Sequence, residues 1–120
     1  MTGNNLKKED LRQFNGTKAI YINPAVSFTY TDGIKYLCEN ANCFWLLDVI
    51  ESYQNQLNGV FLQWWEVNVS QEGERRSCKI KCHDGRNNFF VEQNVEHTDF
   101  PLEKITLFLL NNTLLLPSEN

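Results

Sequence analysis

The segment over residues 31–54 constrains the fold most, because its apolar residues recur at the spacing of an α-helix. At about 100° per residue, four of them share one narrow face. They are Ile34, Leu37, Cys38 and Ala41. After Asn42 the apolar face changes phase and consists of Trp45, Leu46, Val49, Ile50 and Tyr53. This change of phase predicts two short helices with a bend at residues 40–42.

Capping residues are expected where each helix begins. Thr31 or Asp32 precedes the helical unit, and short oxygen-bearing side chains accept the free N–H groups of a first turn. An earlier, shorter helix is expected from Asn4 or Asn5 to about Phe14. Helices are therefore predicted only in the first half of the chain.

From residue 60 onward the apolar residues recur at every second position, which is the period of a β-strand. In the segment 60–69, Trp65 and Val67 fall on one face, while Leu62 and Trp64 fall on the other. Because both faces carry large side chains, this strand is expected to lie in the centre of a sheet. Other extended segments are expected at residues 19–22, 25–30, 77–83, 89–95, 105–110 and 113–116, with a polar loop at 70–76.

Turn residues connect these strands. Asp84 and Gly85 begin one turn, after which the returning strand is expected to place Phe89 and Val91 on its inner face. Asn111–Asn112 reads as a two-residue hairpin turn with positive φ angles.

These elements predict an α+β fold, with an antiparallel sheet of about five strands and two or three N-terminal helices packed on one face. The chain has 120 residues and a mass of 14.0 kDa, which is the size of one domain, over residues 1–120 with a flexible tail at 1–5. The second face of strand 60–69 would then need cover from another element or from a second subunit. Self-association is therefore one expectation.

Charge and hydropathy narrow the class of protein. The formal net charge is −4 and the basic residues are scattered, so no nucleic-acid partner is expected. The polar N-terminus lacks the apolar core of a signal peptide, and no apolar run is long enough to span a membrane. A cytoplasmic location is expected, with the four cysteines as reduced thiols.

The cysteines are expected to be buried apolar residues and not metal ligands, and no cofactor is expected. Cys78 and Cys82 lie on one face of a strand, where a rise of roughly 3.3 Å per residue separates their sulfurs by about 13 Å. That is too far for one zinc ion. A metal-dependent fold would need one of them to meet another cysteine or His83 across the sheet.

Acid–base chemistry offers few candidates. His83 and His97 both flank turns, Asp99 precedes a Phe-Pro turn, and Asp48 interrupts the apolar run 44–50 on the polar side of its helix. These local roles account for all four residues. A small enzyme would instead need Asp48, His97 and Asp99 to converge within about 3–4 Å in one pocket.

The pair Trp64–Trp65 is the strongest aromatic feature. Adjacent residues of a strand face opposite ways, so one tryptophan belongs to the core and the other faces a second layer or a partner. Aromatic side chains of this kind are typical anchors of protein interfaces.

Five segments occur in an order that resembles a family of small, uncharacterised bacterial and phage-associated proteins, known only as a domain of unknown function. They are LRQFNGT (11–17), YTDGIKYL (30–37), FWLLD (44–48), HTDFPL (97–102) and LLLPSE (114–119). The chain departs from this pattern at residues 18–24, where more aromatic and basic residues are usual, and at Asn42, where glycine is common. The resemblance implies a stand-alone single-domain protein, often in a mobile-element context, and implies no reaction.

The function that these observations favour is a non-enzymatic module that binds another protein, or a second copy of itself, through an apolar or aromatic surface. The candidate binding residues are Trp64, Trp65, Asp48, His97 and Asp99. The alternative is a small enzyme that uses carboxylate and histidine acid–base chemistry.

Overall fold

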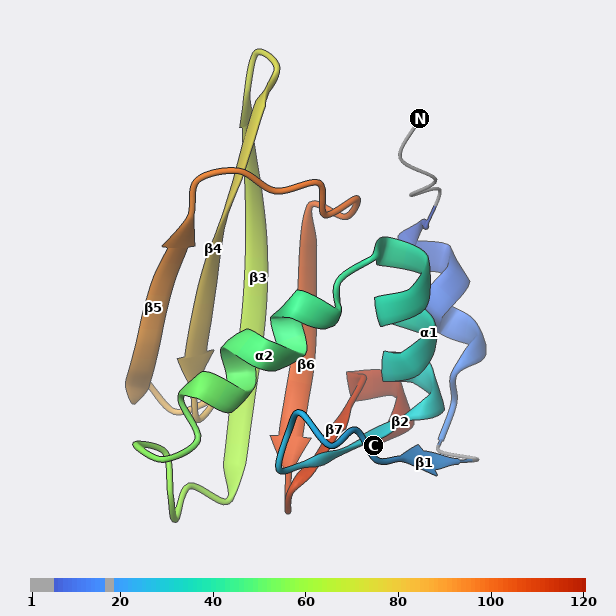
Figure 1. Ribbon diagram of the computed structural model, residues 1–120, viewed down its shortest axis with the longest axis vertical. Coiled ribbons are helices and arrows are strands. Elements are labelled where there is room, and N and C mark those ends of the chain that lie inside the picture. Colours follow the sequence, from blue (N-terminus) through green and yellow to red (C-terminus); the bar gives the residue numbers. More distant parts are fainter. Residues whose placement is uncertain (1–5, 17–18) are drawn as a thin grey trace.

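The structure is a computed structural model that describes residues 6–16 and 19–120. Its described residues form one seven-stranded sheet in the order β1-β2-β7-β6-β3-β4-β5 (Figure 1). The strands are β1 (Ile20–Tyr21), β2 (Thr29–Thr31), β3 (Leu62–Glu72), β4 (Arg75–His83), β5 (Phe89–Val95), β6 (Lys104–Leu110) and β7 (Thr113–Leu115). The α-helices are α1 (Asp32–Ala41) and α2 (Phe44–Ser52), and two short 3-10 helices are η1 (Lys8–Gln13) and η2 (Pro117–Glu119).

The mixed α and β composition is confirmed, but two parts of the prediction are wrong. The sheet has seven strands and not about five, and the α-helices follow β1 and β2 instead of opening the chain. The expected first helix is the short 3-10 helix η1, while the expected tail and capping residues at 1–5 lie outside the described residues. The miscount arises because β1 and β2 join the sheet through a parallel pairing of β2 with β7, which a succession of hairpins does not produce.

The predicted pair of helices is confirmed. The side chain of Thr31 accepts a hydrogen bond from the N–H of Ile34 at 3.3 Å and so caps α1. α1 ends because Asn42 adopts a left-handed conformation, with φ 51°, and α2 starts two residues later at Phe44. The buried stripe of α1 is the predicted one.

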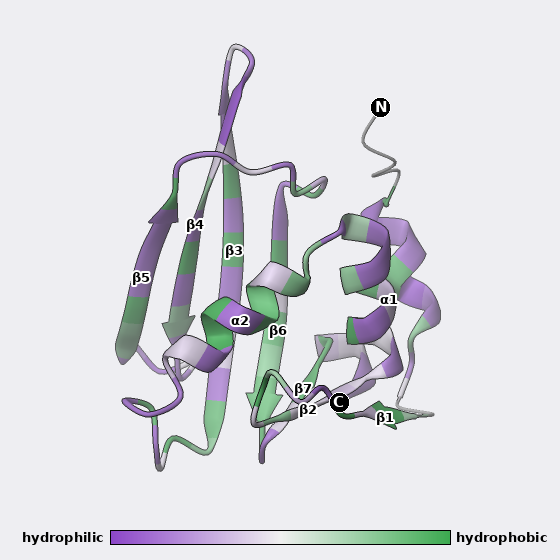
Figure 2. Ribbon diagram, in the orientation of Figure 1, coloured by the Kyte–Doolittle hydropathy of each residue, from purple (hydrophilic) through white to green (hydrophobic). Residues whose placement is uncertain are grey.

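Both α-helices lie on the same side of the sheet (Figure 1), and the hydrophobic core fills the space between the two layers. In that core the indole of Trp65 is fully buried and its ring centroid lies 6.1 Å from that of Tyr53. Figure 2 shows that β6 is largely hydrophobic, whereas the hairpin end of β3 and β4 is hydrophilic. None of the helices formed by the described residues is long and apolar enough to cross a membrane.

β3 occupies the central position that its two apolar faces predict, since it pairs with β4 on one edge and with β6 on the other. It is longer than expected and continues through residues assigned above to a polar loop. The β3–β4 ladder extends to the pair Glu72 and Arg75, with a tight turn at Gly73. Polar side chains do not end a strand here, because this end of the hairpin extends beyond the helices into solvent (Figure 1).

One side chain of β5 points away from its predicted face. The register of the β4–β5 ladder shifts between Cys82 and His83, so that Phe89 lies opposite His83. Because one extra residue reverses the alternation of faces, Phe89 is 65% exposed instead of facing the core. The predicted turn at Asn111–Asn112 is confirmed, with φ angles of 49° and 66°.

A buried carboxylate joins the C-terminal end of the described chain to the start of α1. Glu119 in η2 is only 6% exposed, and its oxygens accept hydrogen bonds from the Thr31 hydroxyl at 2.7 Å and from the Gly33 N–H at 3.1 Å. A third bond, from the Leu116 N–H at 2.9 Å, holds the same carboxylate within its own turn. The negative charge also lies at the positive end of the α1 dipole, which is stabilising.

Only glycine fits at position 33. A Cβ atom there would lie 2.5 Å from the Oε1 atom of Glu119, and all three of its nearest neighbours would be atoms of that carboxyl group. The close approach of Glu119 to the helix is therefore possible because residue 33 has no side chain.

This arrangement predicts that the effect of Gly33→Ala on the free energy of unfolding depends on whether Glu119 is present. Glu119→Ala is expected to lower the free energy of unfolding by about 3 kcal/mol, because buried donors lose their acceptor. Gly33→Ala alone is expected to cost about 2 kcal/mol through overpacking. In the Glu119→Ala background the same glycine change becomes neutral or stabilises by up to about 1 kcal/mol, since alanine favours helix over glycine.

Urea denaturation measures all four variants, and Glu96→Ala, at an exposed position, is the matched control with an expected change below about 0.5 kcal/mol. Equal costs of Gly33→Ala in both backgrounds contradict the steric role of Glu119.

Candidate functional site

The sheet has one side covered by the α-helices and one side that they leave open. Alternation along β3 places Trp65 on the covered side, where the residue is fully buried, and Trp64 on the other. Figure 1 shows no helix behind β3, β4 and β5, and none of the described helices packs there. We call this second side of β3, β4, β5 and β6 the open face. The prediction that the two tryptophans have opposite surroundings is confirmed.

Four aromatic rings gather on the open face. The Trp64 ring stacks on His83 with centroids 5.2 Å apart and meets the edge of Phe108 at 4.9 Å. His83 in turn lies 5.2 Å from Phe89. These residues come from four adjacent strands, and we refer to Trp64, His83, Phe89 and Phe108 as the aromatic patch.

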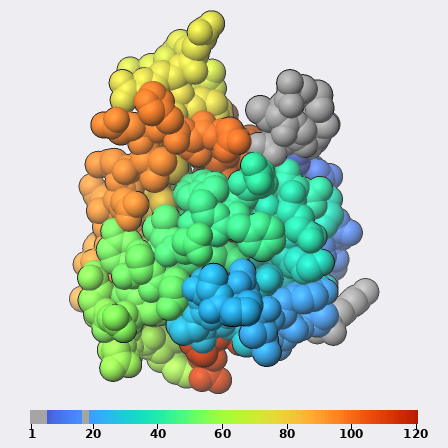
Figure 3. Space-filling view, in the orientation of Figure 1, coloured from blue at the N-terminus to red at the C-terminus, as the bar shows by residue number. Residues whose placement is uncertain are grey.

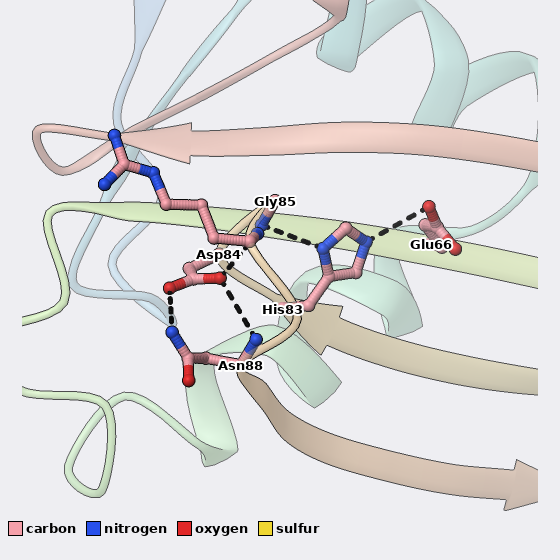
Figure 4. A network of polar contacts seen from close by, with 6 residues as sticks. Glu66, His83, Asp84, Gly85 and Asn88 are labelled. Atoms are coloured by element: carbon pink, nitrogen blue, oxygen red, sulfur yellow. Dashed lines mark hydrogen bonds and ion pairs between the residues drawn. The ribbon is translucent and has the colours of Figure 1, made fainter.

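The imidazole of His83 is oriented by hydrogen bonds on both of its nitrogens (Figure 4). Its Nδ1 atom accepts a hydrogen bond from the Gly85 N–H at 3.0 Å, so the proton of the neutral ring lies on Nε2. Nε2 then donates to the carboxylate of Glu66 at 3.2 Å.

The turn after β4, at residues 84–88, lies beside His83 at the edge of the aromatic patch. Asp84 accepts hydrogen bonds from the side chain of Asn88 at 2.7 Å and from the Arg86 N–H at 2.8 Å, and these bonds lower the pKa of the Asp84 carboxyl (Figure 4). Gly85 comes so close to Trp64 that a Cβ atom would lie 3.1 Å from the indole ring. The turn is thus packed against one edge of the patch.

Trp64 also carries an unsatisfied polar atom. Its Nε1 atom is buried and, within the part of the chain that the structure describes, has no hydrogen-bond acceptor. Buried donors almost always have a partner, because an unpaired one costs about 1–3 kcal/mol. Within the described residues, no hydrogen bond offsets the cost of burying this donor.

Two of the other candidate residues, His97 and Asp99, form a second, separate group. They line an open cavity of about 970 Å³ at the end of β4 opposite His83, and the segment that contains them is drawn in orange in Figure 3. Its lining is Trp45, Glu74, Arg75, Arg76, Val95, His97, Thr98 and Asp99. The guanidinium group of Arg76 already donates hydrogen bonds to the side chain of Gln71 and to the carbonyl of Phe100.

Asp48 does not belong to this cavity. It lies exposed on α2 and is not among the lining residues, so the structure brings together His97 and Asp99 but not the third member of the proposed catalytic set. The cavity is lined by the guanidinium group of Arg75, the engaged guanidinium group of Arg76 and the carboxylates of Glu74 and Asp99. They do not by themselves form a nucleophile and base.

All four cysteines are buried, and we expect their thiols to be unreactive. Burial raises the pKa of Cys82 to about 12, and burial also raises the pKa of Cys78. The pKa of Cys38 is raised above its ordinary value, first by its hydrogen bond with Cys43 and then by burial. Among residues 6–16 and 19–120, no three His, Cys, Asp or Glu side chains are grouped so that they could hold a metal ion.

Sequence reasoning missed the partners of Trp64. It treated His83 as a turn-flanking residue and did not connect it with Glu66 or Phe108. The signal was partly available, because Trp64 and Glu66 share a face by alternation. The cross-strand neighbours depend on register, which places His83 and Phe108 opposite Trp64 and which no local pattern reveals.

These observations define a mixed α/β protein with a sheet covered on one side and an aromatic patch on the other. The chain belongs to a family of unknown function, DUF6876, whose model matches residues 5–120. Because the function of the family is unknown, the match assigns no activity to the chain. It also does not test the bacterial or phage association, which stays a prediction. No curated protein and no solved structure matches the chain significantly.

The buried thiols predict slow chemical labelling. In the native protein at neutral pH, none of the four cysteines is expected to react with Ellman's reagent on the timescale of minutes, because all four are buried and the pKa values of Cys38, Cys78 and Cys82 are raised. All four are expected to react in denaturant. Ser70→Cys, at an exposed position, is the positive control. A fast-reacting native cysteine contradicts this prediction and favours a nucleophilic enzyme.

The raised thiol pKa values also give stability a direction with pH. Unfolded cysteines lose their protons near pH ~8.5, whereas the folded state retains them to higher pH. The unfolded state therefore binds fewer protons in this range, and the free energy of unfolding is expected to fall as the pH rises from about 8.5 towards 12. Urea midpoints across this range measure it, and a Cys82→Ala variant is expected to show a smaller pH dependence.

Proposed function

We propose that the protein is a non-enzymatic binding module that associates with another polypeptide through the aromatic patch. The single observation that carries this proposal is the position of Trp64, His83, Phe89 and Phe108 together on a face that the described helices leave open. Clusters of aromatic residues with a charged or polar rim are the usual centres of protein interfaces. The polypeptide to which we commit is a second copy of the same chain.

Apolar burial provides the driving force for this association. Phe89 is 65% exposed, and covering a phenylalanine side chain contributes about 1–2 kcal/mol when part of it is already buried. Each copy would contribute this gain, together with the shared cover over Trp64 and Phe108.

Charge on the open face supports a second copy as the partner. The patch is bordered by lysines and glutamates: Lys81 lies opposite Glu66 in the β3–β4 ladder, and Lys79 forms an ion pair with Glu92 at 3.5 Å. A face that carries both signs is complementary to itself, because a two-fold axis brings the cations of one copy towards the carboxylates of the other.

A small enzyme remains the second candidate, favoured by one observation. His97 and Asp99 line the same open cavity as Arg75, so side chains able to do acid–base chemistry and one guanidinium group lie along one cavity. The candidate is weaker because Asp48 lies outside the cavity and the buried cysteines are held as neutral thiols. A cytoplasmic location and a mobile-element context belong to the proposal of a binding module and rest on composition and on resemblance.

The two tryptophans are expected to separate folding from assembly. Trp65→Ala removes the largest fully buried side chain and is expected to lower the free energy of unfolding by about 3–5 kcal/mol. Trp64→Ala is expected to keep a cooperative fold while it abolishes the dimer. Native mass spectrometry reports both states, since a dimer has twice the 14.0 kDa mass of the chain.

Phe89→Ser provides a gentler test, because the residue is 65% exposed and its loss leaves the core intact. It is expected to weaken the dimer at least tenfold, as a residue at an interface centre does. Phe44→Ser, on α2 at the covered side, is the matched control and is expected to change nothing. A native protein that stays monomeric at every concentration, or equal effects of the two phenylalanine changes, overturns the self-association proposal.

A further inference from the structure

A groove distinct from the aromatic patch lies between η1, the first residues of β6 and the turn that leads into η2. Its volume is about 430 Å³, within the range of small-molecule sites in proteins. It is lined by Lys8, Leu11, Arg12, Leu102, Lys104, Ile105, Thr106, Leu116, Pro117 and Ser118. None of these residues belongs to the aromatic patch, so the site does not depend on the proposed function.

The floor of the groove is apolar. Leu11, Leu102, Ile105 and Leu116 are between 3% and 8% exposed, and they come from η1, from the start of β6 and from the residue before η2. They are parts of the hydrophobic core that form a wall of the groove. An apolar chain laid against them would extend the core without displacing any of its members.

The rim of the groove is cationic, although the protein as a whole is acidic. Lys8, Arg12 and Lys104 line it and are all exposed, whereas no carboxylate is among the lining residues. In the described part of the chain none of the three forms an ion pair. Three cations around one groove contrast with the formal net charge of −4.

The nearest acidic residues along the chain are engaged elsewhere or lie outside the lining. Asp10 of η1 accepts the Lys7 N–H at 2.9 Å, and Glu119 of η2 is buried against Thr31 and Gly33. Glu9 follows Lys8 and Glu103 precedes Lys104, and both are exposed and outside the groove lining. The positive rim is therefore not neutralised by the groove's own residues.

The groove also occupies a place where the sheet is incomplete. β7 pairs with β6 only over Phe108–Leu110, so within the described sheet the first four residues of β6 are paired on the β3 edge alone. The side chains of Lys104, Ile105 and Thr106 from this segment line the groove, and Ser118 adds a second hydroxyl. Cations and hydroxyl donors thus surround an apolar floor.

We propose that this groove binds an aliphatic carboxylate of medium chain length. The hydrocarbon chain lies along Leu11, Leu102 and Leu116, and the carboxylate is held at the rim by Arg12 and Lys104. Arginine suits this role because its planar guanidinium group donates two parallel hydrogen bonds to one carboxylate. The volume selects a single short chain, since a lipid with two long chains would not fit in about 430 Å³.

The test is isothermal titration calorimetry with sodium decanoate below its micelle concentration, with decanol as the uncharged probe of the same chain length. Decanoate is expected to bind with one site per chain and at least tenfold more tightly than decanol. Arg12→Glu and Lys104→Glu are each expected to weaken decanoate binding by about tenfold or more, because each reverses a charge beside the carboxylate. Both positions are exposed, so the variants are expected to retain the native circular dichroism spectrum.

Arg86→Glu is the matched control, since Arg86 is exposed and lies outside the groove, and its decanoate affinity is expected to equal that of the unchanged protein. Three results would each overturn the proposal. These are no heat of binding with decanoate, equal affinities for decanoate and decanol, or equal losses for Arg12→Glu and Arg86→Glu. If either groove variant fails to fold, the other decides.

Discussion

The carboxylate of Glu119 at the start of α1 is the contact on which the smaller half of the molecule depends. It is buried, it bonds to Thr31 and Gly33, and it fixes η2 against the helix that covers β2 and β7. Placing a carboxylate in the interior is costly unless its oxygens are satisfied, and here three donors and a helix dipole meet that requirement. The parallel pairing of β2 with β7 and the capping of α1 are therefore two results of bringing the same two chain segments together.

The larger half of the sheet follows a different principle. β3, β4 and β5 are consecutive antiparallel strands, and alternation gives them a covered side and an open side. The covered side is filled with closely packed apolar residues and has fully buried Trp65 at its centre. The open side combines aromatic rings with paired charges. The two functional surfaces inferred for this protein lie outside the well-packed core, where the chain has residues that the fold does not require.

Local patterns predicted much of this architecture. The capped helix after Thr31, the bend at Asn42 and the turn at Asn111–Asn112 follow from short-range rules and are confirmed. What sequence alone did not reveal is how the segments pair: the parallel join of β2 to β7 and the approach of Glu119 to Gly33, which are long-range, and the register shift within the β4–β5 hairpin that exposes Phe89. The same holds for the sites. Trp64 was identified from its position in a strand, but His83, Phe108 and the three cations of the groove became neighbours only through the fold.

The parallel pairing of β2 with β7 has a consequence for the order in which the chain can fold. Thr29 and its partner Thr113 are separated by most of the sequence, so this pairing requires a large loop to close. The hairpins from β3 to β5 need no such closure and can form while the rest of the chain is still unstructured. On a ribosome, Trp64, His83 and Phe89 would therefore be brought together before β7 offers β2 a sheet edge to join.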